Sequence, residues 1–456
     1  MSIPWLRPLT ALFPKGVVVS DTETLKAHAG DAWFASTLPQ AVVFPRKATE
    51  VAALLRFANK RRIPVTARGA GRGYVGGCVP KKHGIVVSFA RMNRILEINP
   101  VDGIGVVQPG VITGEFQSRV RQHGLLYPPD PASLKECFLG GNVATNAGGP
   151  RCLKYGVTRN YVLGLQVALA DGTLVRVGGR TMKNKSGFDL VGIFVGSEGL
   201  LGLVTEITLR LIPAPPARGG LSASFKNASA AAACVQHLFR EGFLPSALEL
   251  ADRFTLQAAR RHLGAKNLPK GDAHLLIEID GQTASVRSEI RMLAELVKEG
   301  GALEINLATT EAACENLWAL RREFSASLKA TGLTKLNEDI CVPRSRLVDL
   351  FNFTARLQKK YRIDVASFGH AGDGNIHVNI MADMKLPGVK KRADRALNEL
   401  FRQVIAWGGA ITGEHGIGLA KLPWWPQAAS PKLRRLHASI KKALDPNNIL
   451  NPGKFV

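Results

Sequence analysis

The sequence predicts an α+β protein built from more than one domain, and three observations support this. An extended apolar run at residues 41–45, an amphipathic helix pattern at 51–58 and a second extended run at 63–66 together predict a β-α-β start. Asp171-Gly172 lies between two apolar runs, which is typical of a β-hairpin. The proline- and glycine-rich stretch at residues 213–220 has the composition of a linker between domains.

The N-terminal half carries the clearer strand and helix signals. Val51, Leu54, Leu55 and Ala58 recur at i, i+3, i+4 and i+7, as on the buried face of a helix. Further strands are predicted at residues 84–89, 162–170, 174–177 and 203–211, the last because its apolar and polar residues alternate.

Beyond the linker, residues 393–407 predict an amphipathic helix that ends at Gly408-Gly409. A turn at residues 371–374 and a strand at 375–380 are also expected. We therefore divide the chain into an N-terminal extension (1–37), a first domain (38–216), a second domain (217–440) and a C-terminal tail (441–456).

Composition excludes several classes of protein. A chain of 456 residues exceeds one compact core, and 46% hydrophobic with 21% charged residues is typical of a folded protein. No apolar stretch approaches the roughly 18 residues of a membrane span, and Pro4, Arg7 and Pro8 interrupt the apolar N-terminus, so we expect no secretion signal. Six scattered cysteines without a C-x-x-C argue against disulfides, a cysteine zinc site or an iron–sulfur cluster and favour the cytoplasm.

The net charge of +24 raises the question of an anionic partner. Lys and Arg are spread along the chain without a basic stripe interleaved with aromatics, so we expect no nucleic-acid binding. Peripheral contact with an anionic membrane surface, or with an acidic protein, is compatible with this charge. A simpler explanation of the net charge is that the proteins of the source organism are basic in general.

Three glycine-rich tracts suggest where a nucleotide binds. In the first, Gly71-x-Gly73-x-x-Gly76 matches the dinucleotide fingerprint, but Pro80 and Gly84 prevent the helix that an NAD site requires. Its backbone N–H groups could still hold phosphates, with a flexible surface loop as the alternative. A second loop at residues 140–149 and a third tract at 196–202 add further places of close backbone approach, which a long dinucleotide needs.

Three histidines and a carboxylate gather in two glycine-rich segments. His370 and His377 lie within residues 369–379, and Glu414 and His415 lie within 412–418. Two histidines and a carboxylate suit a divalent ion such as zinc, while scattered structural histidines remain the alternative. Such a set suits alcohol oxidation. A metal lowers the pKa of the hydroxyl that it binds, and a neutral histidine accepts the hydroxyl proton. A cofactor must then accept the hydride.

The order of the glycine tracts, with Arg68, Pro129 and Lys154-Tyr-Gly156, resembles the FAD-binding domain of the vanillyl-alcohol oxidase/p-cresol methylhydroxylase superfamily over residues 38–216. The resemblance implies a two-part FAD-binding domain, with the first tract on the pyrophosphate and the second along the isoalloxazine and ribityl chain. Neither loop offers a matching histidine, so we expect FAD to be bound non-covalently. Arg72 replaces the usual small hydroxyl residue and could pair with phosphate. The implied cofactor-binding residues are Arg68, Gly69, Ala70, Gly71, Arg72, Gly73, Pro129, Gly140, Gly141, Asn142, Thr145, Asn146, Gly148, Gly149, Gly156, Glu198, Gly202 and Asn451.

The second half resembles the C-terminal domain of FAD-linked oxidases, a group that includes glycolate oxidase flavoprotein subunits, D-lactate dehydrogenases and D-2-hydroxyglutarate dehydrogenases. The matching motifs are Trp318-Ala-Leu-Arg321, 339–343, 369–379, 413–418 and 444–454. The resemblance implies a ferredoxin-like α+β cap domain with an antiparallel sheet, and a tail that packs back on the FAD domain.

The same resemblance implies roles for individual residues. His370, His377 and Glu414 would be metal ligands and His415 the general base, while Arg321 would bind the substrate carboxylate through its fork of donors. Without the resemblance, an exposed helix arginine is the alternative for Arg321. Ser325, Asn337 and Asn379 would lie beside the substrate.

Together these features predict FAD-dependent oxidation of a small D-2-hydroxy acid to the 2-oxo acid, with hydride transfer to flavin N5. The D-2-hydroxyglutarate branch usually has lysine where this chain has Asn337, which favours D-lactate or glycolate, although Lys335 could reach in instead. Electrons would leave to a quinone, a cytochrome, an electron-transferring flavoprotein, a separate iron–sulfur subunit or oxygen. A metal-dependent hydrolase and a non-catalytic flavin-binding subunit are the alternative functions.

Overall fold

A computed structural model describes residues 3–264 and 270–456. The chain folds into two compact units. Unit 1 comprises residues 1–148, 157–214 and 414–456, and unit 2 comprises residues 149–156 and 215–413. The 214/215 division falls inside the linker that composition indicates. No helix among the described residues is long and apolar enough to cross a membrane.

The first sheet of unit 1 has four strands in the order β1 (Val18–Val19), β2 (Ala41–Val43), β4 (Ile85–Ser88) and β3 (Val65–Arg68). Strands β2 and β3 run parallel to β4. Helix α3 (Ala48–Arg61) buries the predicted residues Val51, Leu54, Leu55 and Ala58 in the core of this sheet. The expected β-α-β start is therefore confirmed. Two short helices, α1 (Leu6–Thr10) and α2 (Thr22–Ala27), precede it.

The C-terminal end of the chain completes this sheet. The amide of Val65 donates to the carbonyl of Ile449, and the amide of Asn451 donates to the carbonyl of Val65, both at 2.7 Å. Ile449 and Leu450 are buried in the same core as α3. Residues at opposite ends of the sequence thus share one core.

The second sheet of unit 1 is antiparallel, in the order β5 (Ile95–Asn99), β6 (Ile104–Val107), β10 (Leu203–Arg210), β8 (Val162–Ala168) and β9 (Leu174–Gly178). The predicted hairpin around Asp171-Gly172 joins β8 to β9, and the predicted alternating strand is β10. A two-stranded ribbon pairs β7 (Leu125–Leu126) with β11 (Ile212–Pro213). The helices of this part are α4 (Thr113–Arg121), α5 (Leu139–Thr145), α7 (Leu190–Phe194), α14 (Trp425–Ala428) and α15 (Pro431–Leu444).

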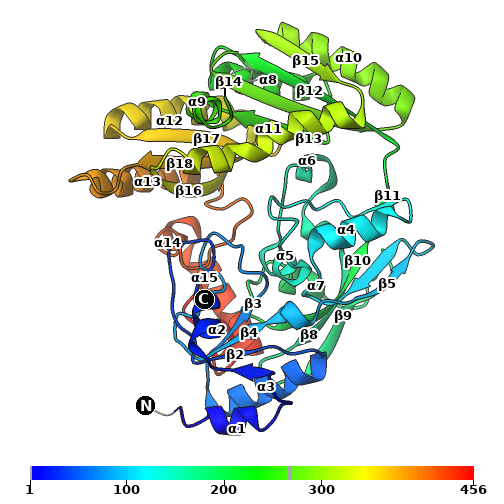
Figure 1. The fold of residues 1–456 in the computed structure, drawn as a ribbon, viewed down its shortest axis with the longest axis vertical. Helices are drawn as coiled ribbons and strands as arrows, with labels where there is room; N and C mark the ends of the chain where they lie inside the picture. Colours follow the sequence, from blue (N-terminus) through cyan, green and yellow to red (C-terminus); the bar gives the residue numbers. More distant parts are fainter. Residues whose placement is uncertain (1–2, 265–269) are drawn as a thin grey trace. The chain divides into compact units, whose positions relative to one another are not determined.

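Unit 2 is one seven-stranded antiparallel sheet with helices on both faces (Figure 1). Its order is β15 (Glu304–Ala308), β12 (Ala217–Phe225), β14 (Ala273–Gly281), β13 (Ala247–Ala251), β17 (Asp364–His370), β18 (Asn375–Ala382) and β16 (Thr334–Cys341). Its helices are α6 (Cys152–Tyr155), α8 (Ala228–Arg240), α9 (Arg253–Leu263), α10 (Thr283–Glu299), α11 (Glu311–Lys329), α12 (Leu347–Tyr361) and α13 (Val389–Ala406). The antiparallel α+β second half is as predicted.

The two faces of this sheet differ in chemistry. A Cβ added at Gly219 would meet Val286 and Ile290 of α10, whereas one at Gly220 would meet Leu317 and Cys314 of α11, so these helices cover opposite faces. Helices α9 and α11 pack together on one face, where Phe324 and Leu328 meet Phe368 and Met381. We call this the α11 face. The same face continues into polar side chains on β13, β16, β17 and β18, which form part of the candidate site.

Candidate functional site

A buried carboxylate lies at the centre of the polar side chains on the α11 face. In the strand register Glu249 of β13 is opposite His370 of β17. The Nδ1–H of His370 donates to Oε1 of Glu249 and the Nε–H of Arg321 donates to Oε2, each at 2.5 Å. The Glu249 side chain is 2% exposed and that of Arg321 13% exposed. One carboxylate therefore holds a histidine and an arginine from two different elements.

The charge on Glu249 is maintained by its partners. Burial alone would raise the pKa of the Glu249 carboxyl, but the charges of Arg321 and His370 and their hydrogen bonds hold the pKa at about 2. Metal binding would require His370 to lose its Nε2 proton, which leaves the lone pair on Nε2 while Nδ1 still donates to Glu249. The arrangement is the carboxylate–histidine pair that commonly orients a metal-binding histidine.

A second buried carboxylate, Asp339 of β16, organises the next histidine. Oδ1 of Asp339 is 3.9 Å from Nδ1 of His377, and it accepts a hydrogen bond of 2.6 Å from Asn375 Nδ2. Its Oδ2 accepts from the Thr412 hydroxyl and from the Gly413 amide, both at 2.9 Å. Asp339 thus binds the strand that carries His377 and also the turn at Thr412-Gly413, which directly precedes Glu414.

The three predicted metal ligands meet a simple geometric test. His370, His377 and Glu414 each offer one ligand atom, and those atoms lie within 4.8 Å of one another. Glu414 is bonded directly to Gly413, where any Cβ would collide with the Asn375 side chain, so a glycine is required there. Two imidazole nitrogens and one carboxylate oxygen form a donor set that suits zinc.

The predicted substrate-contacting residues also occupy the α11 face. Asn337 of β16 and Asn379 of β18 are opposite each other in register, and the side-chain oxygen of each is buried without a hydrogen-bond partner among the described residues. Such groups are costly to bury unless a ligand or water satisfies them. Ser325 lies one turn beyond Arg321 on α11, and its hydroxyl receives a hydrogen bond of 2.9 Å from Lys335 Nζ.

Lys335 lies closer to these residues than the sequence alone indicates. It is two residues before Asn337 on β16, on the same face, and its ammonium is 5.7 Å from the centre of the Phe368 ring. The guanidinium of Arg321 is 4.9 Å from the centre of the same ring. Burial, followed by the positive charges of Lys329 and Arg321, lowers the pKa of Lys335 to about 8. Two cations therefore border one aromatic side chain.

In unit 1, the first two glycine-rich tracts approach each other closely. A Cβ added at Gly69 would lie 3.5 Å from Cα of Gly141, whereas one at Gly141 would meet nothing within 4 Å. The first tract contains no helix, as expected. The second is not the simple loop that the sequence suggested, because residues 139–145 form α5 and only then does the chain turn at Asn146. Bare backbone thus faces open space where an extended ligand can lie.

The two arginines assigned to the cofactor have protein partners. The guanidinium of Arg68 donates to the carbonyls of Gly30 (2.5 Å) and Ala27 (3.3 Å). It thereby fixes the N-terminal segment beside the first tract. Arg72 forms an ion pair of 2.7 Å with Glu136, and both side chains are about half exposed. Arg72 is therefore the more available of the two for a phosphate.

Glu198 connects the third tract to the segment that follows His415, and Asn451 connects the third tract to the first. Glu198 accepts hydrogen bonds from the amides of Ile417 (2.7 Å) and Gly418 (2.9 Å), and burial raises its pKa. Asn451 donates to the carbonyls of Gly77 and Glu198. The ring of His415 lies 5.3 Å from that of Tyr74, within the first tract. His415 is therefore held beside the loop assigned to FAD.

The remaining predicted cofactor residues have mainly local contacts. Gly73 accepts a backbone hydrogen bond from Ala32, Asn142 donates to Thr113, and a side chain at Gly202 would collide with Val167. Ala70, Pro129, Thr145, Asn146 and Gly148 lie in or beside the same tracts of unit 1.

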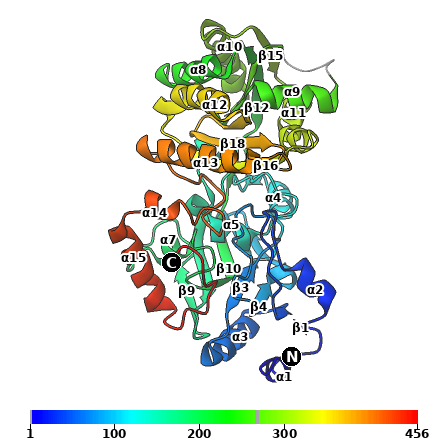
Figure 2. The same cartoon turned by 90° about the vertical axis from the view of Figure 1, so that its left-hand side faces the viewer.

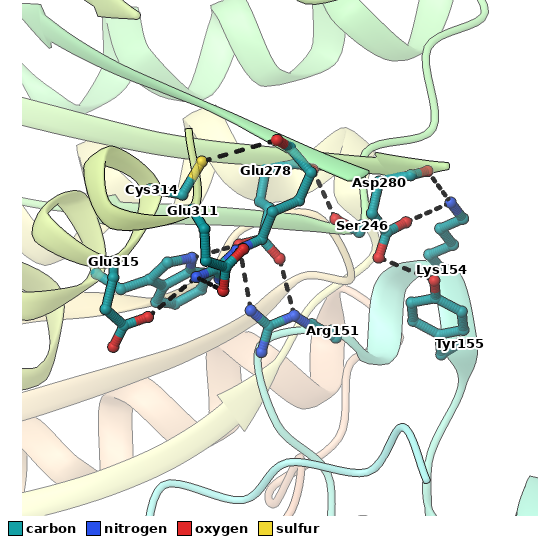
Figure 3. A network of polar contacts seen from close by, with 11 residues as sticks. Arg151, Lys154, Tyr155, Ser246, Glu278, Asp280, Glu311, Cys314 and Glu315 are labelled. Atoms are coloured by element: carbon teal, nitrogen blue, oxygen red, sulfur yellow. Dashed lines mark hydrogen bonds and ion pairs between the residues drawn. The ribbon is translucent and has the colours of Figure 1, made fainter. Parts of the chain in front are cut away.

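Gly149 and Gly156, in contrast, bound a short segment that belongs to unit 2. Arg151 binds Glu278 at 2.8 Å, and Lys154 and Tyr155 bind Asp280 (Figure 3). Arg218 and the indole N–H of Trp318 also bind Glu278. These two glycines therefore mark the ends of a segment that is anchored on β14.

Sequence reasoning missed Glu249, Asp339 as an organising residue, and Tyr74. Glu249 stands in the otherwise apolar run at residues 247–251, and a lone charge in a buried strand is the signal that could have identified it. Asp339 and Tyr74 lie within motifs that the sequence does reveal, but their roles depend on contacts distant in sequence. Neither role could be read from spacing alone.

Residues 214–455 match the family described as FAD linked oxidases, C-terminal domain, and residues 39–178 match the FAD binding domain. The chain belongs to the FAD-linked oxidases. It is therefore an oxidoreductase with an FAD-binding domain, as predicted. This membership argues against the metal-dependent hydrolase, which would leave the glycine tracts unexplained.

The relatives of this FAD-linked oxidase include three named enzymes or subunits. The chain is 39% identical to glycolate oxidase subunit GlcD of Bacillus subtilis over 92% of this chain and 89% of that protein. It is 35% identical to a D-lactate dehydrogenase of Anaerostipes hadrus, covering 97% and 95%. It is 32% identical to a D-2-hydroxyglutarate dehydrogenase of Stutzerimonas stutzeri, covering 98% and 97%.

Solved structures support the fold. 4-Ethylphenol oxidase from Gulosibacter chungangensis aligns with a TM-score of 0.78 at 22% identity, covering 99% of this chain and 96% of that one. p-Cresol methylhydroxylase aligns with a TM-score of 0.77 at 19% identity, covering 99% and 96%. The expected resemblance in fold to the p-cresol methylhydroxylase superfamily is confirmed.

The first glycine tract yields a prediction about FAD retention. Gly71 has φ +71°, and a Cβ there would collide with the Arg68 guanidinium. We expect Gly71→Ala to displace both the loop and Arg68, and to weaken FAD binding at least about tenfold. The measurement is the ratio of flavin to protein after dialysis, followed by titration with FAD. Gly16→Ala is the matched control, because Gly16 has φ +83° but no neighbour within 4 Å. Equal flavin content in both variants would contradict the assignment of the tract.

Proposed function

We propose that this FAD-linked oxidase oxidises a D-2-hydroxy acid to the corresponding 2-oxo acid. The observation that carries the proposal is the position of Glu249 between Arg321 and His370. Arg321 is suited to bind a carboxylate, and His370 is suited to bind a metal ion that holds a hydroxyl group. Both side chains are hydrogen-bonded to the same buried carboxylate. A 2-hydroxy acid presents those two functions on adjacent carbons. The three named relatives, whose substrates by name are hydroxy acids, support the same chemistry.

Bound FAD would supply the hydride acceptor, which no amino-acid side chain provides. The residues that would hold it non-covalently are those of the first tract, residues 69–73, together with the start of α5. The fit is supported by the open space over Gly141 and by the buried Asn451 side-chain oxygen, which has no partner among the described residues.

Arg321 would bind the substrate carboxylate. Its Nε–H is committed to Glu249, and the guanidinium carries further N–H donors in the same plane. The Glu249 contact fixes the direction of this fork, so the substrate meets a preorganised group and little rotamer freedom is lost on binding. Asn337 and Asn379 would accept hydrogen bonds from the substrate or from water held with it.

His370, His377 and Glu414 would hold a divalent ion, for which zinc is our proposal. Such an ion lowers the pKa of a hydroxyl that it binds. His415, the next residue after Glu414, would accept the hydroxyl proton as general base. Glu198 would keep its segment in place through the amides of Ile417 and Gly418.

Lys335 points to the kind of substrate. The lack of lysine at position 337 favours a monocarboxylate, but the structure places two cations, those of Lys335 and Arg321, beside the ring of Phe368. A 2-hydroxy acid with a second anionic group can satisfy both cations, whereas lactate or glycolate satisfies one. We therefore extend the proposed substrates to four- and five-carbon hydroxy diacids.

The proposal is tested by anaerobic reduction of the bound flavin. We expect D-2-hydroxy acids, including D-lactate and D-2-hydroxyglutarate, to remove the oxidised-flavin absorbance, and their L-enantiomers to leave it. His415→Ala should slow this reduction by about 100-fold or more, because general-base catalysis contributes that much. His262→Ala, at an exposed histidine, should not change it. A fully loaded flavin that every D-2-hydroxy acid leaves oxidised would refute the proposed activity.

The role of Glu249 can be measured without turnover. Glu249→Gln keeps the shape but removes the charge that orients His370, so we expect the affinity for zinc to fall about 10- to 100-fold. Competition with a chelator reports this affinity directly. Glu304→Gln on exposed β15 of the same sheet is the control and should leave the affinity unchanged. Unaltered zinc retention in Glu249→Gln would show that this carboxylate does not support a metal.

The role of Lys335 should be visible in pH dependence. Its pKa of about 8 means that the ammonium is charged below that pH and neutral above it. We expect KM for D-2-hydroxyglutarate to rise as pH passes 8, while KM for D-lactate stays nearly constant. Lys335→Met should raise KM for the diacid at least about tenfold at neutral pH and abolish that pH dependence. Lys359→Met, at an exposed position on α12, is the control. Equal effects on both substrates would rule out selection by Lys335.

A further inference from the structure

An exposed apolar loop stands out on the surface of unit 1. Every residue from Thr181 to Leu190 is exposed. The loop includes Met182, Phe188 and Leu190, which are 69%, 89% and 41% exposed. Helix α7 continues from it and buries Val191 and Phe194, while Ile193 stays 36% exposed on the side of Leu190. Large apolar groups seldom protrude in such a group on a surface that contacts only water.

Helix α15 carries a second apolar stripe without a covering element. Of its fourteen residues only Lys441 is buried. Leu433, Leu436 and Ile440 are spaced i, i+3 and i+7, and therefore lie along one side of the helix. Leu433 and Leu436 are 43% and 57% exposed. The opposite side of the helix is attached through Lys441, whose Nζ donates to the carbonyls of Leu200 (2.8 Å) and Leu450 (2.7 Å), and the ring of His437 packs against Trp425 and Phe455.

A groove lies between the segment that begins with α7, which continues from the loop, and helix α15. Ile193 and Leu200 line it from one side, and His437, Ile440 and Phe455 line it from the other. Figure 2 shows α7 and α15 next to each other in unit 1. We call the 181–190 loop, α7 and the exposed side of α15 the loop–helix surface.

The charges around this surface are predominantly positive. Lys183 and Lys185 lie in the loop, and Lys432, Arg435 and Lys442 are exposed on α15. The sequence of α15 contains no acidic residue. Asp189, the one acid of the 181–190 loop, is engaged because its carboxylate caps α7 by accepting from the Gly192 amide at 2.9 Å. The surface therefore combines protruding apolar groups with a basic rim.

We propose that the loop–helix surface binds the face of a lipid bilayer that contains anionic phospholipids. Basic residues would meet the lipid phosphates, and Phe188, Leu433 and Leu436 would enter the boundary between headgroups and acyl chains. Phe188 is more exposed than Leu433 and Leu436. A fluid bilayer accepts side chains that protrude to different extents, whereas a protein partner requires a complementary shape. This proposal is independent of the substrate and of the metal.

The test is flotation of the FAD-loaded protein with lipid vesicles. Vesicles of phosphatidylcholine with about one-third phosphatidylglycerol should carry the protein, and pure phosphatidylcholine vesicles should bind it at least about tenfold less. Phe188→Ser with Leu436→Ser, and separately Lys432→Glu with Arg435→Glu, should each weaken binding to the anionic vesicles about tenfold or more. Flavin content should stay the same in all variants.

Two pairs of control substitutions test whether vesicle binding depends on this surface or on exposed apolar and basic residues elsewhere in the protein. Leu244→Ser with Leu303→Ser removes residues that are 57% and 61% exposed in unit 2. Lys390→Glu with Lys391→Glu reverses two exposed charges on α13. We expect both to retain vesicle binding. The proposal is overturned by failure to float with anionic vesicles at low salt, or by equal losses in the control and test pairs. Failure to float combined with capture by an acidic protein through the same residues would assign the surface to a protein partner instead.

Discussion

The buried carboxylate of Glu249 is the constraint on which the rest of the proposed site depends. An unpaired charge buried beside an antiparallel sheet would cost several kcal/mol of folding free energy. The folded chain must therefore provide partners for it. Here the pairing comes from a strand and from a helix, since His370 ends β17 and Arg321 lies on α11. The need to neutralise one acid therefore fixes the positions of two groups of different chemistry. Because both contacts are direct, neither partner can reorient without exposing the acid to an apolar environment.

The strand register carries this constraint across the sheet. Side chains alternate between faces, so residues opposite one another in register point to the same side. Glu249, His370, His377, Asn379, Asn337 and Lys335 are brought to one side in this way. Asp339 adds the turn at Thr412-Gly413 by accepting two hydrogen bonds from it. The polar end of the sheet is thus built by backbone geometry, and Glu414 is bonded to the last residue of this turn.

Much of this could be predicted from the sequence, because the signals are local. The β-α-β start, the hairpin at Asp171-Gly172 and strand β10 follow from periodicity and turn residues that act within a few positions. The absence of a helix after the first glycine tract follows from Pro80 and Gly84 in the same way. The histidines and Glu414 stand in motifs whose chemistry is visible from residue type.

The parts that could not be predicted depend on contacts distant in sequence. Glu249 has no motif of its own and gains its role only when β13 pairs with β17. The second glycine tract contains helix-breaking residues, but α5 forms there nonetheless, and its Gly140 lies so close to Pro109 that a side chain would collide. Lys335 and Asn337 share a face, so position 337 alone was an incomplete guide to the charge near the substrate. No local pattern reveals that residues 149–156 are anchored on β14 by Arg151 and Lys154.

The pairing of Val65 with Ile449 and Leu450 has a consequence for biosynthesis. The first sheet of unit 1 begins with β1 at Val18, but its core includes Ile449 and Leu450, which are translated after the whole of unit 2. Contacts so distant along the chain close slowly, since the loop between them must lose its conformational freedom first. Unit 2, apart from its short 149–156 segment, is contiguous and has no such delay. We therefore expect unit 2 to fold during translation before unit 1 is complete, and unit 1 to become competent to take up its cofactor only after residues 449–451 have been translated.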